Sequence, residues 1–293
     1  MKRKPILAYI LSSVAMVLVC FAYYRRYLVN ARETLDLYFG IHFHGLIVDK
    51  AYIWKSGLDS IGIHVSLVII PIFFILLLWA VRGRLKANVL LTGLMFYPIT
   101  AFYVHSRYII LFDDDLCDLL FLIAFSLSVF SIIFSVISIY TNEQKLHVTK
   151  HVPKSISISY FVLVVISLLG YVTLGLVSDR ALNFICWSYR GDYFAFVLIL
   201  VILLFYCTKA VLRNDEKGYI TLPIVVTALT ISITSPLGIT ARLFQYELPL
   251  EILYEYYMVH MKTVPWIILL FSLVSILYLL YLCTRFVEEG HDG

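Results

Sequence analysis

Charged residues are scarce in this sequence. Asp, Glu, Lys and Arg make up 14% of its 293 residues, apolar residues make up 61%, and the mean hydropathy is +0.91. Because about a quarter of an ordinary soluble domain is charged, so few charges exclude a soluble globular protein, a disordered chain and a nucleic-acid-binding protein. We therefore predict an integral membrane protein whose backbone hydrogen bonds are made within helices.

The common enzyme motifs are missing as well. The sequence contains no Walker A loop, no G-x-S-x-G motif, no dinucleotide-binding fingerprint and no C-x-x-C or H-E-x-x-H zinc spacing. The cofactor therefore stays unknown, and no residue is assigned as a metal ligand from a motif. Among its five cysteines, Cys117 and Cys186 fall in two different segments that we assign to the outer side of the membrane, where an oxidising compartment would permit a disulfide between them.

Eight stretches contain no charged residue at all. Seven have 20 to 24 residues and one has 16, whereas about 20 apolar residues cross the hydrocarbon core of a bilayer. They are 5–24, 60–81, 87–106, 119–142, 155–178, 193–208, 218–241 and 263–284. A charge at mid-membrane costs about 2.5–3.5 kcal/mol. The gaps therefore predict an all-α, polytopic bundle of about eight transmembrane helices that forms one domain over residues 1–293.

Basic residues collect on alternate connectors. With the N-terminus inside, the inner segments hold 13 Lys and Arg against 6 acids, and the outer segments hold 10 against 13. This positive-inside pattern predicts that both termini lie inside, although Arg25 and Arg26, directly after the first run, conflict with it locally. The basic start Met1–Lys4 is similar to that of a signal peptide, but no small-x-small cleavage site follows, so we expect the first span to stay attached.

Outer loops one and four are predicted to contain short interfacial helices. Leu37–Val48 is free of charge for 12 residues, too few to span, and would lie in the interface or re-enter the membrane. In loop four, Pro249 suits a first helical turn. Glu247, Glu251 and Glu255 repeat every four residues opposite an apolar face, which predicts an amphipathic helix.

Small residues line one face of the fourth run: Ala124, Ser128, Ser131, Ser135 and Ser138. Such a face predicts close packing against another membrane helix, and a serine-lined conduit is the alternative. In the seventh run, Thr227, Thr230 and Thr234 repeat with the same spacing. They would either pair with the serine face or lie between bends at the flanking prolines.

Side chains suited to catalysis gather on the outer side. The candidate catalytic acids are Asp113 and Asp114 in loop two and Glu247 and Glu251 in loop four, because a carboxylate can serve as a general base. Two other interpretations of the acids in loop two remain open. They would bind a divalent cation, or they would complement the dipole at the start of the fourth helix.

The candidate substrate-binding residues share the same side: Arg107, Arg190, Arg242, His42, His44 and His260. Arginine suits phosphate because its planar fork binds two oxygens at once. Ordinary salt bridges and headgroup contacts would also explain the arginines. A metal site, or an interfacial belt with neighbouring aromatic residues, would explain the histidines.

Three functions follow from this distribution. The first is an enzyme acting at the outer leaflet on a lipid-linked or phosphorylated substrate, including a glycosyl lipid. The second is a non-enzymatic membrane partner, such as an immunity, exclusion or assembly protein. The third is a transporter, which the lack of charges near mid-membrane disfavours.

The expected partners are membrane lipids, together with a lipid-linked substrate or a membrane protein, and not nucleic acid. The 22 Tyr and 20 Phe are typical of bacterial envelope membrane proteins. We therefore expect a multi-pass protein of the bacterial cytoplasmic membrane.

Overall fold

The computed structural model describes the backbone of residues 5–41, 67–105, 115–141, 146–148, 152–177, 180–234 and 264–288. Side chains are described for 5–25, 67–103, 116–141, 152–169, 195–232 and 270–285. All structural statements below refer to these residues.

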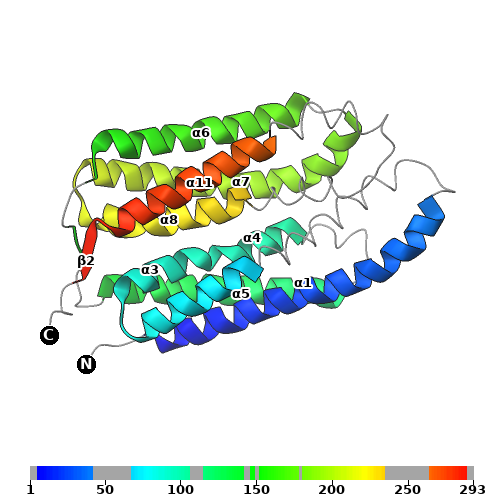
Figure 1. The fold of residues 1–293 in the computed structure, drawn as a ribbon, viewed down its shortest axis with the longest axis horizontal. Helices are drawn as coiled ribbons and strands as arrows, with labels where there is room; N and C mark the ends of the chain where they lie inside the picture. Colours follow the sequence, from blue (N-terminus) through cyan, green and yellow to red (C-terminus); the bar gives the residue numbers. More distant parts are fainter. Residues whose placement is uncertain are drawn as a thin grey trace.

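The described chain is built mainly from long apolar helices (Figure 1). Their bounds are α1 Ile6–Ile41, an unlabelled helix Leu67–Val81, α3 Leu85–Leu94, α4 Phe96–His105, α5 Asp115–Thr141, α6 Lys154–Val177, α7 Arg180–Leu212, α8 Glu216–Thr234 and α11 Val264–Cys283. Each of the eight charge-free runs contributes to one of these helices or, for the third run, to the pair α3 and α4. The prediction of a helical, membrane-like fold is therefore confirmed in part.

Four helical segments are long and apolar enough to cross a membrane, fewer than the eight predicted. They are Ile6–Arg25, Leu85–Tyr103, Leu116–Thr141 and Ala195–Leu212. Three further apolar helices are shorter within the described residues: Leu67–Val81, Lys154–Leu169 and Leu270–Cys283. α8 is neither among the four long segments nor among the three shorter apolar helices.

The third predicted span is divided into α3 and α4 at Met95. Pro98 explains the division, because proline has no N–H to bond the Leu94 carbonyl and its ring crowds that oxygen. The Met95 N–H still donates to the Leu91 carbonyl at 3.1 Å. The two helices therefore form one interrupted rod.

Two helices extend well beyond the runs that predicted them, so the predicted outer loops one and three are shorter than expected. α1 continues through Ile41 and includes the first residues of Leu37–Val48, where a separate interfacial helix was expected. α7 begins at Arg180 and includes most of outer loop three. Neither extension contains proline, and charges outside the hydrocarbon do not end a helix. The predicted helix of loop four lies outside the described residues.

The all-α prediction holds for the described chain, apart from one small antiparallel strand pair. β1, Leu146–Val148, pairs with β2, Phe286–Glu288, so that His147 lies opposite Val287. β1 belongs to the connector between α5 and α6, and β2 follows α11. The pairing joins two connectors that the charge distribution had assigned to the same side.

These connectors form what we call the basic end of the bundle. In Figure 1 the start of α1, the turn at 82–84, the turn at 213–215 and the sheet lie together at the left. The turns contain Gly83 and Asn214 at φ 93° and 59°, a backbone region that glycine and asparagine adopt most easily. The described side chains here comprise eight basic residues, Arg82, Arg84, Lys86, Lys154, Lys209, Arg213, Lys217 and Arg285, and two acids, Asp215 and Glu216.

α1 packs against α5 along faces of small residues, which confirms the predicted packing role of the serine face. On α1 the buried residues are Ala8, Ser12, Ala15, Val19 and Ala22; on α5 they are Ala124, Ser128, Ser131 and Ser135. Both series alternate steps of four and three residues, the spacing of an interhelical seam. Thr227 of α8 does not pair with this face, because it lies against Gly93 of α3.

Hydrogen bonds fix the antiparallel register of this seam. Ser131 Oγ donates to the Ala8 carbonyl at 3.0 Å, and Cys117 Sγ lies 3.7 Å from the Ala22 carbonyl oxygen. Fourteen residues, two heptads, separate the two contacts on each helix. Ser128 Oγ is buried in the seam without a hydrogen-bond partner among the described residues.

The helices form two groups, visible as lower and upper layers in Figure 1. The first contains α1, the Leu67–Val81 helix and α3 to α5, and the second contains α6, α7, α8 and α11. Each group has its own apolar core. α3 joins them, because Ala87 and Leu91 belong to the first core while Leu85 and Val89 belong to the second.

The groups come closest where α3 meets α8. A Cβ atom built on Gly93 would lie 2.6 Å from Thr227 Cβ and 3.0 Å from the Ile224 carbonyl oxygen. Only glycine therefore permits this approach of the two helices. Further along α8, between α4 and α8, the hydroxyls of Thr100 and Ser232 lie within hydrogen-bond distance at 3.2 Å.

Candidate functional site

The described part of the end opposite the basic end contains one buried carboxylate. Asp118 lies in the first turn of α5 and is 8% exposed, whereas Asp215 and Glu216, the other acids with described side chains, are exposed at the basic end. A buried charge is costly unless its surroundings compensate it. Asp118 is therefore the described acid with the strongest indication of a specific role.

Aromatic rings cover the base of this turn. Phe121, one helical turn after Asp118, packs edge-on against Tyr23 with ring centroids 5.1 Å apart, and Tyr23 stacks on Tyr97 at 6.5 Å. All three rings are buried. They join α5 to α1 and to α4 beside the turn that holds Asp118.

The N-terminal end of α5 stabilises part of the negative charge of Asp118. The first four N–H groups of a helix have no partner within it, and together with the helix dipole they favour negative charge nearby. Asp115 is the first residue of α5, and Asp118 is the fourth. This placement agrees with the interpretation that the acids of loop two complement the helix dipole. It also puts a buried polar side chain at the predicted membrane boundary.

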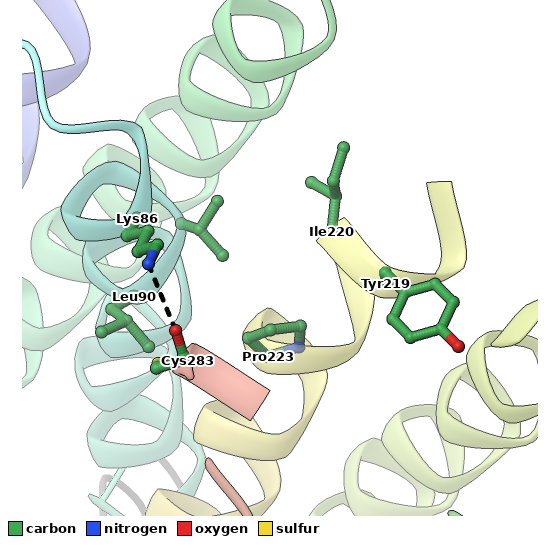
Figure 2. A pocket seen from close by; sticks show the side chains of 7 residues that line it. Lys86, Leu90, Tyr219, Ile220, Pro223 and Cys283 are labelled. Carbon is green, nitrogen blue, oxygen red and sulfur yellow. Dashed lines mark hydrogen bonds between the residues drawn. The ribbon is translucent and has the colours of Figure 1, made fainter. Parts of the chain in front are cut away.

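A second candidate lies at the basic end, in a groove between α3, α8 and α11 (Figure 2). Its lining residues are Lys86, Val89, Leu90, Tyr219, Ile220, Pro223 and Cys283. The Lys86 ammonium donates to the Cys283 carbonyl at 3.3 Å, at the end of α11. The cavity volume is about 10 Å³, which is room for one water-sized group.

A buried polar network between α6 and α11 has a structural role. Tyr160 donates to Ser275 Oγ at 3.1 Å, and the hydroxyls of Ser157 and Tyr278 lie 3.2 Å apart. The two tyrosine rings stack with centroids 4.3 Å apart. Because these four hydroxyls bond in two pairs across the two helices, they hold α6 and α11 together and have a structural role.

Most of the site residues predicted from the sequence lie outside the described residues: His42, His44, Arg107, Asp113, Asp114, Arg242, Glu247, Glu251 and His260. Arg190 and Cys186 belong to α7, in a part whose side chains are not described. Cys117 is buried in the seam against α1. The catalytic, substrate-binding and disulfide assignments therefore stay predictions.

Asp118 is the residue that sequence reasoning passed over. It belongs to no motif and stands just outside the charge-free run 119–142. Its sequence position does indicate burial. Asp118 stands three residues before Phe121 and seven before Phe125, so all three lie on one face of the helix. The ring centroids of Phe125 and of Phe102 in α4 are 4.7 Å apart. This face of α5 therefore points into the bundle.

Within the described ranges, no three residues among His, Cys, Asp and Glu are placed to hold a metal ion together. Comparison with protein families, with characterised proteins and with solved structures finds no match for this chain. The fold itself defines its class, a helical protein with several helices suited to a membrane.

Proposed function

We propose that the chain is a multi-pass enzyme of the bacterial cytoplasmic membrane that acts at the outer leaflet on a lipid-linked, phosphorylated substrate such as a glycosyl lipid. It crosses the membrane eight times with both termini inside. The end opposite the basic end carries the chemistry.

Two features of the described chain support eight crossings. All eight charge-free runs are helical in their described parts, and the pairing of β1 with β2 brings the connector after α5 to the same end as the segment after α11. Residues at one end of a bundle are separated by an even number of crossings. α6, α7, α8 and α11 supply four crossings between these two strands.

The observation that carries the enzymatic proposal is the buried carboxylate of Asp118 at the predicted outer boundary. A buried ionisable side chain in a membrane segment is a candidate functional residue. Asp118 stands four residues after Asp114, so its α5 turn leads directly into the loop with the candidate catalytic acids. The basic end, by contrast, has tight turns and a strand pair.

The chemistry follows from the residue types gathered on the outer side. In this proposal Arg107, Arg190 and Arg242 clamp the phosphate, because guanidinium groups bind phosphate oxygens in pairs. Asp113, Asp114, Glu247 and Glu251 supply the general base that deprotonates the attacking group. His42, His44 and His260 bind the polar part of the substrate, whose lipid tail stays in the bilayer.

The test compares lipids and saccharides by untargeted mass spectrometry in cells with and without the protein. We expect a species that depends on the wild type and falls at least about tenfold in Arg242→Ala, Asp113→Ala and Asp118→Asn, since a general base contributes about 10²–10⁴-fold. The matched control is Asp215→Asn, the same change at an exposed acid of the basic end. Full product in Arg242→Ala and Asp113→Ala at equal protein levels would overturn the proposal.

The length of α1 favours a second function, that of a membrane partner in immunity, exclusion or assembly. α1 has 36 residues and is about 54 Å long at 1.5 Å per residue, more than a bilayer requires. Figure 1 shows its far half leaving the bundle. Co-purification of a stoichiometric membrane protein that is lost when 28–41 are deleted would support this function over the enzymatic one.

A further inference from the structure

We propose that α1 pairs in parallel with α1 of a second copy of the chain. The contact is a stripe of hydrophobic residues that repeats every seven positions along the side of α1 turned away from α5. None of these residues belongs to the candidate site, so the proposal goes beyond both functions proposed above and does not depend on the chemistry of the outer side.

This heptad stripe, as we call it, runs the whole length of α1. With Leu7 as the first position of a heptad, the first and fourth positions are hydrophobic in five successive heptads. The first positions are Leu7, Val14, Phe21, Leu28 and Leu35, and the fourth positions are Ile10, Val17, Tyr24, Ala31 and Tyr38. Hydrophobic residues at these two positions form the contact of a coiled coil, and three or four heptads are enough to indicate one.

Inside the bundle the heptad stripe is left uncovered by the described residues. Its six side chains from Leu7 to Tyr24 are 45–57% exposed. The residue after each first position, Ala8, Ala15 or Ala22, is buried in the seam with α5. Lipid chains cover an exposed apolar face within the hydrocarbon, so this part of the stripe does not by itself identify a partner.

The part of α1 beyond α5 distinguishes a protein partner from lipid. Cys117, near the start of α5, lies against the Ala22 carbonyl, so the later residues of α1 extend past α5, as Figure 1 shows. The positions that continue the α5 face then carry charge, at Arg26, Glu33 and Asp36. The heptad stripe stays hydrophobic over the same stretch, which predicts that it stays covered.

The hydrocarbon core is too thin to cover the whole heptad stripe. From Leu7 to Tyr38 the stripe is about 46 Å long at 1.5 Å per residue, against about 30 Å of hydrocarbon. The extension also cannot lie flat on the membrane surface without a bend. α1 is one continuous helix through Ile41, and it contains no proline and no glycine before Gly40. A partner helix is therefore needed to cover the last two heptads.

A second copy fits this role because it presents the same stripe at the same height. Two copies in one membrane have the same orientation, so their α1 helices meet in parallel and in register about a two-fold axis along the membrane normal. In a parallel pair, the seventh position of one helix lies beside the fifth position of the next heptad of the other. In the extension these positions place Tyr27 beside Arg32 and Thr34 beside Phe39, so no like charges meet.

Disulfide cross-linking of the full-length protein in membranes tests this register. Cys20→Ser first removes the native cysteine beside the stripe, and single cysteines are then added to that parent. Leu28→Cys and Leu35→Cys should give a disulfide-linked dimer under mild oxidation, because equivalent first positions face each other across a parallel coiled coil. The matched controls Arg26→Cys and Glu33→Cys occupy the heptad position farthest from the contact. They should cross-link no more than the parent, since a disulfide needs Cα atoms within about 7 Å of each other.

Native mass spectrometry from mild detergent measures the assembly itself. The wild type should appear as a complex of two chains. Leu28→Glu/Leu35→Glu should lower the dimer fraction at least about tenfold, because four carboxylates would meet in the contact without partners. Val29→Glu, the same kind of change outside the stripe, should leave the dimer intact.

Three results would overturn the proposal: a single-chain wild type, equal cross-linking at all four positions, or a different protein bound in place of the second copy. Neither readout measures product formation, so a failure here is distinct from a failure of the enzymatic proposal.

Discussion

Gly93→Val is expected to separate the two helix groups and to lower the free energy of unfolding by about 3 kcal/mol, the upper range for overpacking. The reason is steric. Even a single Cβ atom would lie 2.6 Å from Thr227 Cβ and 3.0 Å from the Ile224 carbonyl oxygen, and the second of these is backbone that cannot rotate away. α3 must therefore move as a whole relative to α8.

Thermal unfolding in detergent or nanodiscs measures this effect. The control is Val68→Leu, which enlarges a side chain that is 62% exposed on the Leu67–Val81 helix and should change the unfolding temperature little. The smaller change Gly93→Ala should be partly rescued by Thr227→Gly, because the rescue removes the closest atom. Wild-type stability of Gly93→Val would show that α3 and α8 do not meet as described.

Ala15→Leu is expected to have an effect of similar size at the other close interface. Ala15 is fully buried on α1 and faces the small residues of α5, so three added carbons must push the helices apart or force a strained rotamer. Opening the seam would also stretch the bond from Ser131 to the Ala8 carbonyl. We expect a loss of about 3 kcal/mol and a large fall in folded protein recovered from membranes.

Two controls separate packing from other causes. Val17→Leu enlarges a side chain of the same helix that is 57% exposed and should be neutral. Ser128→Ala should be neutral or slightly stabilising, because it removes a buried hydroxyl that has no partner among the described residues. A seam that accepts Ala15→Leu without loss would contradict the antiparallel register of α1 and α5.

Charge spacing predicted where the helices lie but not where they end. The cost of burying charge limits the apolar runs to the thickness of the hydrocarbon core, so α5 and α6 begin and end within a few residues of their runs. α7 extends from Arg180 because a helix continues into the headgroup region as long as its backbone allows. The division of α3 from α4 depends instead on Pro98, a backbone effect that charge counting does not measure.

The packing partners and the buried acid depend on tertiary structure. The serine spacing of α5 predicted a close interface, but the partner was identified only by the matching face of α1 from Ala8 to Ala22. Asp118 is charged by sequence but buried in the fold, one turn before Phe121, whose ring packs against Tyr23 of α1. The candidate site on the outer side therefore remains a prediction from residue types, with Asp118 as its structural anchor.

The central claim, eight crossings with the basic end inside, is tested most directly by labelling single cysteines with a membrane-impermeant maleimide. Cysteines introduced at Asp59 and Glu247, in predicted outer loops, should react in intact spheroplasts. Cysteines introduced at Arg82 and Asp215, in the two turns of the basic end, should react only after the membrane is opened. Labelling at Asp215 in intact spheroplasts, or the same accessibility at all four positions, would contradict the account.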